Sequence, residues 1–182
     1  MSELSEIREQ FVILLLGAME RPVPTIWHVQ KEIFILSKIQ PKIQDLFQFV
    51  KHYEGPYSQL LQESVKEPIH YDRAYEFNSS DALILLSEGR DIFNRIKVEN
   101  EKLESFARII NSLKLIRTIY DKLSKDELLL LIYVTYPSYI EFSNIYDDLV
   151  RNDDKRKRIA SNLLLKGLIT NSRYEELVQN VS

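Results

Sequence analysis

The chain has 182 residues, of which 45% are hydrophobic and 28% are charged, and its formal net charge is −3. This composition is typical of a globular protein and excludes a disordered chain, and the length suits one ordinary domain or two small ones. Because the sequence contains no cysteine, disulfides and thiolate metal sites are also excluded.

The N-terminal region favours a soluble, cytoplasmic protein. It begins with the acidic and polar segment Met1–Glu6, which is the wrong start for a signal peptide. The apolar run that follows, Phe11–Ala18, is well short of the roughly 20 residues that a membrane span needs. We therefore expect a cytoplasmic chain with no membrane partner.

Apolar residues at helical spacing dominate the first fifty residues. The helices that this spacing predicts cover about residues 4–19 and 26–38, and a third helix or a short turn covers 42–46. Thr25 is the expected N-cap of the second helix, and Pro41 ends it because proline cannot continue a helix. Residues 47–53 are rich in aromatic and β-branched side chains, which favours extended backbone.

The middle of the chain predicts a helix followed by a β-hairpin. The Gly-Pro step at 55–56 is a turn signal, and proline suits the first turn of a helix, which we expect to run to about Lys66. Alternating polar and apolar residues then predict a strand over 69–77 and a shorter one over 83–86, joined as a hairpin. Ser87 is the expected N-cap of the next helix.

The remaining sequence predicts helices only. One long helix over 101–123 carries a continuous apolar face, which we expect to be core, with a dimer seam as the alternative. Ser124 and Glu127 have the spacing of a capping box. Gly167 suits the position just after a helix. The expected later helices cover about residues 128–134, 143–150 (capped by Ser143), 153–167 and 172–179.

The order of these elements predicts a mainly α fold. Residues 1–98 are expected to form a winged helix-turn-helix-like domain with a small β-hairpin. Residues 99–182 are expected to form a helical domain, in which the long helix 101–123 precedes a small helical bundle.

No pattern in the sequence indicates catalysis, a metal site or a cofactor. The chain has only four glycines and lacks the phosphate-binding glycine loops and the nucleophile elbow of known enzyme classes. His28, His52 and His70 are scattered without a metal-ligand spacing, so we interpret them as structural or surface residues. We expect no catalytic residue, with an enzyme of unrecognised site as a minor alternative.

Two segments are candidates for binding DNA, although neither part of the chain is basic. There are 11 Lys and Arg against 14 Asp and Glu up to Val98, and 13 against 13 afterwards, so any DNA contact needs a local patch. The first segment lies in the recognition position of a winged helix and its wing, and the second is a run of four cations. The candidate residues are Tyr57, Ser58, Gln59, Gln62, Lys66 and Arg73, and then Lys155, Arg156, Lys157 and Arg158.

Each segment also has a structural interpretation. In the structural interpretation, the turn before the recognition position fixes the chain and packs Tyr57 into the core, and has no binding role. Glu54, Glu63 and Glu67 would repel DNA there. The run 155–158 lies beside acidic residues and fans around its helix, so it can equally be a solvated, locally paired surface.

The segment Phe49–Ser58, which reads FVKHYEGPYS and follows the helical segment Val29–Leu36, resembles a family of small prokaryotic proteins. The family is that of the YwgA-type proteins, with the Panacea (SocA-like antitoxin) domains as a more remote likeness. Leu85–Arg90 is similar to the strand and helix that close many winged-helix regulators, and Glu54 departs from the family pattern. The resemblance covers about residues 7–98 and implies a winged-helix-like fold used for regulation or for recognising a protein.

These observations favour a non-enzymatic winged-helix regulator that binds duplex DNA, with a homodimer as its expected state. The alternative is an antitoxin-like or adaptor module that binds a protein partner and does not bind DNA. The two hypotheses differ in where positive charge lies on the folded surface.

Overall fold

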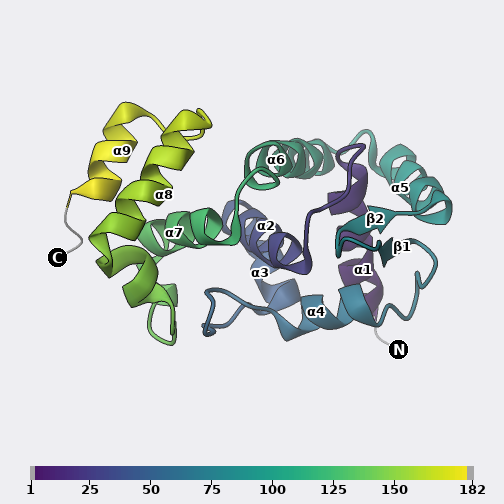
Figure 1. The fold of residues 1–182 in the computed structure, drawn as a ribbon. Coiled ribbons are helices and arrows are strands. Elements are labelled where there is room, and N and C mark those ends of the chain that lie inside the picture. The colour runs from purple at the N-terminus through teal and green to yellow at the C-terminus, as the bar shows by residue number, and fades with distance from the viewer. Residues whose placement is uncertain (1–2, 180–182) are drawn as a thin grey trace. The chain divides into compact units, whose positions relative to one another are not determined.

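The computed structural model describes residues 3–179 and divides the chain into two compact units (Figure 1). The first unit contains residues up to Phe49 and Ser58–Asp121, and the second contains Val50–Tyr57 and the residues from Lys122 onward. The protein is mainly helical, with one small antiparallel sheet. No helix in the described range is long and apolar enough to cross a membrane.

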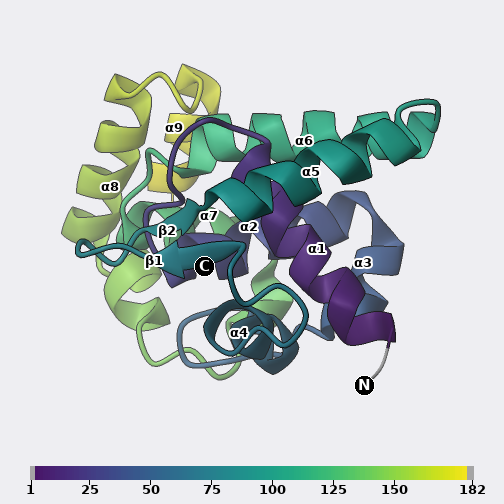
Figure 2. The ribbon, with the colours of Figure 1, turned by 90° about the vertical axis from the view of Figure 1, so that its right-hand side faces the viewer.

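The first unit is built around α1 and α2. Its elements are α1 (Glu3–Gly17), α2 (Ile26–Ile39), α3 (Pro41–Phe47), α4 (Gln59–Lys66), β1 (Tyr75–Phe77), β2 (Leu83–Leu85), α5 (Ser87–Asn100) and α6 (Glu104–Tyr120). Figure 2 shows α1 passing beside both α4 and α5, which it contacts. Residues 12–16 of α1 are all buried, so this helix forms the centre of the core.

Helix α6 completes the first unit by packing against α2. Its buried apolar residues Ile110, Leu113 and Ile116 lie on one face, so this part of the predicted apolar face is core. The division between the units therefore falls after Asp121, whereas the sequence predicted a boundary at 98/99. The difference has a physical reason, because the apolar face of α6 is buried on the N-terminal helices.

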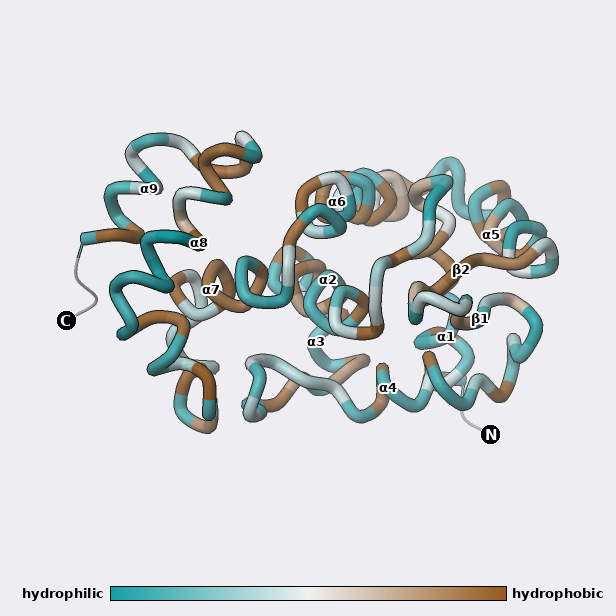
Figure 3. Tube along the Cα trace, viewed as in Figure 1, coloured by the Kyte–Doolittle hydropathy of each residue, from teal (hydrophilic) through white to brown (hydrophobic). Residues whose placement is uncertain are grey.

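The hairpin is shorter than the sequence predicts. Tyr75 pairs with Leu85 and Phe77 with Leu83, and β2 is hydrophobic along its length (Figure 3). Residues 69–74 are not part of the strand. The buried carboxylate of Glu9 instead accepts hydrogen bonds from three successive backbone N–H groups, those of residues 69–71, at 2.8–2.9 Å. These donors are satisfied by a side chain rather than by a neighbouring strand.

Two predicted helix starts shift in the structure. Helix α4 begins at Gln59 with Ser58 as its N-cap, so Pro56 precedes the helix instead of occupying its first turn. Helix α5 includes Ser87 as its first residue, and its N-cap is Leu86, which makes no side-chain cap. Gly89 in this first turn is required for packing, because a Cβ there would lie 2.1 Å from the backbone oxygen of Ala74.

The second unit packs the C-terminal helices together with the segment 50–57. Its elements are α7 (Lys125–Thr135), the 3₁₀-helix η1 (Pro137–Tyr139), the π-helix η2 (Asp147–Arg151), α8 (Asp153–Leu165) and α9 (Asn171–Val178). Within this unit α8 contacts both α7 and α9. Val50 and Tyr57 pair in an isolated antiparallel bridge, so part of the predicted extended segment is confirmed.

Local signals in the second unit predict some boundaries and miss others. The capping box of Ser124 and Glu127 is present at the start of α7, and Gly167 has the predicted left-handed backbone at φ +67 after α8. The helix predicted over 143–150 forms only in its second half, as the π-helix η2, and Ser143 does not cap it. The Ser143 hydroxyl bonds the Tyr133 hydroxyl at 2.7 Å and accepts from the Ile145 N–H at 3.3 Å, which fixes a turn instead.

Candidate functional site

Ser58, the N-cap of the helix α4 at the recognition position, has a structural role. Its hydroxyl donates to the Phe47 carbonyl and accepts from the Leu61 N–H at 3.0 Å. The buried amide of Gln30 accepts from the Ser58 N–H at 3.0 Å and donates to its carbonyl at 2.9 Å. Since Ser58 is completely buried, its side chain is not available to a ligand.

Tyr57 is half-buried and belongs to the second unit. Its ring stacks on the imidazole of His52, with the two ring centroids 4.8 Å apart. The Gly-Pro-Tyr-Ser turn therefore makes local structural contacts, although Tyr57 is half-buried rather than packed into the core.

The accessible face of α4 carries more negative than positive charge. Gln59, Glu63 and Lys66 are exposed, Gln62 is half-buried, and Glu67 is exposed at the C-cap. The Gln59 amide donates to the Glu63 carboxylate at 2.9 Å, which occupies the group that would read a base edge. With two carboxylates against one ammonium, this face repels a phosphate backbone more than it attracts one.

Arg73 is exposed, but it lies in the turn before β1 rather than in a strand. It makes no hydrogen bond or ion pair with another residue in the range 3–179. Its guanidinium is therefore available to an anion. Arg73 does not lie on the hairpin itself, where a wing residue would lie.

The run of four cations divides into a neutralised pair and an accessible pair. Lys155 bridges the carboxylates of Asp126 at 3.1 Å and Asp148 at 2.5 Å. The hydrogen bond with Asp148 is the main cause that raises the pKa of Lys155 above its ordinary value. Arg156 is 2% exposed. It donates to the Val150 carbonyl and, at 2.6 Å, to Asp153.

Lys157 and Arg158 are the accessible pair. Both are exposed, and neither side chain is ion-paired with a residue that the structure describes. Two of the four predicted cations are thus removed from any nucleic-acid surface by local pairing. Of all ten predicted residues, five are exposed, namely Gln59, Lys66 and Arg73 in the first unit and Lys157 and Arg158 in the second.

The second unit also exposes large apolar side chains on two adjacent loops. Val50 is 56% exposed, Tyr53 61% and Phe142 56%, and we call these three residues the loop surface. The loops are tied together by the ion pair of Lys51 with Glu141 and by a hydrogen bond of 3.2 Å from the Asn144 N–H to the Tyr53 carbonyl. The two loops therefore carry exposed apolar side chains on a backbone that these contacts hold in place.

The first unit contains a buried cluster of charged residues that the sequence analysis missed. Arg117 of α6 is fully buried. Its guanidinium donates to the carbonyls of Leu15, Leu16, Arg21 and Pro22 at 2.8–3.2 Å and to the Asp121 carboxylate at 3.0 Å. Arg21 also donates to Asp121, at 2.8 Å. The cluster fixes the loop after α1 to α6.

Glu32 of α2 lies next to this cluster and is completely buried. Its carboxyl oxygens accept no hydrogen bond within the described residues, and in the protonated form the group can donate one to Asp121. Burial, followed by the negative charge of Asp121, raises the pKa of Glu32 well above its ordinary value. Glu32 therefore favours the protonated form, because a second buried carboxylate beside Asp121 is costly.

The histidines have local contacts. His28 is buried beside Thr25, whose hydroxyl is 2.9 Å from Nδ1, and His70 lies 2.8 Å from the Ser5 hydroxyl. In the part of the chain that the structure describes, no group of three or more His, Asp or Glu side chains could hold a metal ion. Comparisons with protein-family models, with curated proteins and with solved structures find no match to this chain.

Proposed function

We propose that this protein is a non-catalytic interaction module that binds a protein partner through the loop surface. The observation that carries the proposal is the exposure of Val50, Tyr53 and Phe142, each more than half accessible on loops that are held together. Exposed aromatic side chains on a fixed backbone supply large contact area at little entropic cost, and tyrosine is enriched among the residues that dominate binding energy.

Charged pairs border the loop surface and suit a polar rim. Lys51 pairs with Glu141, and Lys125 pairs with Glu54 at 2.5 Å. An apolar centre within a polar rim is the usual anatomy of a protein–protein interface. Because the rim charges are already paired, the partner needs an apolar contact face and no strong charge of its own.

In this proposal, the first unit is a winged-helix-like scaffold. The order of α2, α4, the hairpin β1–β2 and α5 supports it, as does the resemblance of residues 7–98 to the YwgA-type proteins. The surplus of carboxylates on α4 favours a regulatory role that acts through protein contacts, because a DNA-reading helix needs the opposite charge.

Site-specific photo-crosslinking in cells tests the proposal. A photoreactive amino acid is placed at Tyr53 or at Phe142, and in a matched control at Leu115, which is 61% exposed on α6 of the first unit. We expect crosslinked species at positions 53 and 142 that are removed by protease and not by nuclease, with none at 115. Crosslinks at 53 and 142 that are removed by nuclease, or no crosslink at either position, would reject the proposal.

A second candidate function is binding of duplex DNA as a regulator. The observation that favours it is that four of the predicted DNA-binding cations, Lys66, Arg73, Lys157 and Arg158, are exposed and have no ionic partner among residues 3–179. It predicts affinity for random-sequence duplex that falls steeply between low and physiological salt. Replacing both Lys157 and Arg158 by glutamine would weaken that binding. The absence of binding at low salt would dismiss this candidate.

A further inference from the structure

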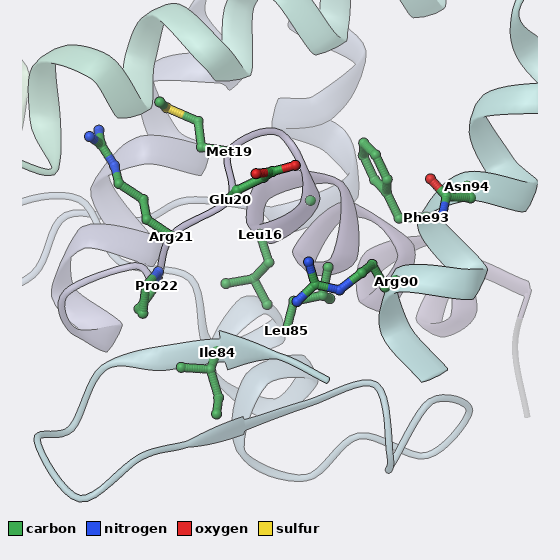
Figure 4. Close-up of a pocket in the computed structure, with 11 residues that line it drawn as sticks. Leu16, Met19, Glu20, Arg21, Pro22, Ile84, Leu85, Arg90, Phe93 and Asn94 are labelled. Atoms are coloured by element: carbon green, nitrogen blue, oxygen red, sulfur yellow. The ribbon is translucent and has the colours of Figure 1, made fainter. Parts of the chain in front are cut away.

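The first unit contains a cavity that neither candidate function uses. Its volume is about 370 Å³, and it is formed by the C-terminal end of α1, the loop after it, β2 and the first half of α5 (Figure 4). Its walls include the apolar side chains of Leu16, Leu85 and Phe93. A cavity of this size is within the range of small-molecule sites.

Two opposite charges face the cavity and are not paired with each other. Figure 4 shows the Glu20 carboxylate, from the loop after α1, and the Arg90 guanidinium, from α5, at the same opening. Neither side chain, nor that of Asn94 on α5, has a hydrogen bond or ion pair with another residue in the described range. The site therefore offers one anion, one cation and one amide to a ligand.

The third charged wall residue, Arg21, is already neutralised. Its guanidinium turns away from the opening in Figure 4 and donates to the Asp121 carboxylate and to the Arg117 carbonyl, each at 2.8 Å. The free charges that remain, Glu20 and Arg90, sum to zero. Both side chains are exposed in the free protein. A zwitterion can pair with both of them at once, whereas a ligand with a single net charge can pair with only one.

The walls of the cavity are fixed before any ligand arrives. Buried Arg117 holds the carbonyls of residues 15, 16, 21 and 22 on one side. Val23 and Leu83 exchange backbone hydrogen bonds of 3.0 and 2.9 Å, which tie the loop to β2. Gly17 lets Phe93 approach α1 closely, because a Cβ at that position would lie 2.3 Å from the ring. A preformed site loses little entropy on binding.

We propose that this cavity binds a free α-amino acid with an apolar side chain. Arg90 would receive the carboxylate, Glu20 would receive the ammonium group, and the apolar side chain would contact Leu16, Leu85 and Phe93. Charge-assisted hydrogen bonds of this kind are the strong ones and give the site its selectivity. The inference does not depend on which partner the protein has.

Titration of the purified full chain with L-leucine, L-methionine and L-phenylalanine, followed by amide NMR shifts, tests the proposal. Two analogues of leucine separate the two charges, since 4-methylpentanoate lacks the ammonium group and 3-methylbutylamine lacks the carboxylate. The variants are Arg90→Gln and Glu20→Gln. Their matched controls are Arg95→Gln and Glu99→Gln, which remove exposed charges of the same sign on α5 outside the cavity.

We expect saturable binding of at least one amino acid, with a dissociation constant of about 1 mM or below. Arg90→Gln and Glu20→Gln should each weaken it about ten-fold, as should removal of either charge from the ligand, while the controls stay within about two-fold. No saturable shifts with any of the three amino acids at about 10 mM would overturn the proposal. So would equal binding of 4-methylpentanoate and leucine.

Discussion

Each of the two units buries one arginine completely or almost so, and the two arginines are used differently. Arg117 of the first unit is 0% exposed and Arg156 of the second is 2% exposed. Arg117 bonds to carbonyls about 100 residues away in the sequence, whereas Arg156 bonds to Asp153 and Val150 nearby and to the Val178 carbonyl at 3.4 Å. One arginine joins distant segments, and the other stabilises the beginning of its own helix.

The two sites also differ in how completely the guanidinium is satisfied. All three nitrogens of Arg117 donate hydrogen bonds, Nε to Asp121 at 3.4 Å. The Nε of Arg156 has no partner within residues 3–179. A fully bonded buried charge is expensive to remove, because its partners are left buried and unsatisfied. Equal burial of two cations therefore does not imply that they contribute equally to the stability of the fold.

The largest expected effect is that of Arg117→Met. The variant keeps an apolar side chain in the helix but leaves four backbone carbonyls without their side-chain donor and Asp121 with Arg21 alone. We expect the free energy of unfolding to fall by about 3–5 kcal/mol, measured by urea denaturation. Arg108→Met is the control, since Arg108 is an exposed residue of α6 paired only with Glu104, and should change stability by less than about 1 kcal/mol. Equal losses in both variants would contradict the central role of Arg117.

Arg156→Met should have a smaller effect. Its Asp153 partner is 58% exposed and remains solvated after the change, and the lost bonds to the Val150 and Val178 carbonyls affect only the second unit. We expect a loss of about 1–3 kcal/mol in the same denaturation experiment. A loss as large as that of Arg117→Met would show that local bonding stabilises the protein as much as bonding between distant segments.

The cluster around Arg117 also predicts a pH dependence of stability. The pKa of Glu32 is raised in the folded state, so the folded chain holds a proton that the unfolded chain releases above about pH 4.5. The contribution of Glu32 to stability is therefore complete below that pH and is lost as pH rises through the folded pKa. Glu32→Gln removes this loss.

Denaturation of Glu32→Gln and of the unaltered protein at a series of pH values checks this effect. The stability of the variant relative to the unaltered protein should rise with pH above about 4.5, by at most about 1.4 kcal/mol per pH unit, and then level off. Glu67→Gln, which changes an exposed carboxylate at the end of α4, is the matched control and should show no such rise. A pH-independent difference for Glu32→Gln would mean that this carboxyl is ionised in the folded protein.

Local signals account for most of what the sequence predicted correctly. The capping box at Ser124, the N-cap Thr25 and the left-handed Gly167 all depend on residues within a few positions of each other. The strand predicted over 69–77 is too long because the carboxylate that satisfies residues 69–71 belongs to Glu9, some 60 residues earlier. Nothing local to 69–74 could indicate that contact.

The candidate sites were harder to predict for the same reason. A helical period through the buried residues Leu113 and Ile116 places Arg117 on the same face, so the sequence did carry a signal that a cation is buried there. The sequence carried no signal for the backbone carbonyls of α1 and of the loop after it, which accept the hydrogen bonds of Arg117. Likewise, the run 155–158 shows four cations, and only the folded positions of Asp126 and Asp148 reveal that Lys155 is neutralised.

The smallest expected effect on stability is that of changing the accessible half of the same run. Lys157 and Arg158 are exposed and have no ionic partner among the described residues, so Lys157→Gln and Arg158→Gln should each change the free energy of unfolding by less than about 0.5 kcal/mol. Urea denaturation of both variants and of Arg156→Met compares the stability effects of buried and exposed cations within one helical turn. A loss above about 1 kcal/mol for either would mean that the side chain has a structural contact, and it would then be a poor choice for testing DNA binding. A negligible loss makes the pair a clean probe, because any change in DNA affinity then reports surface charge alone.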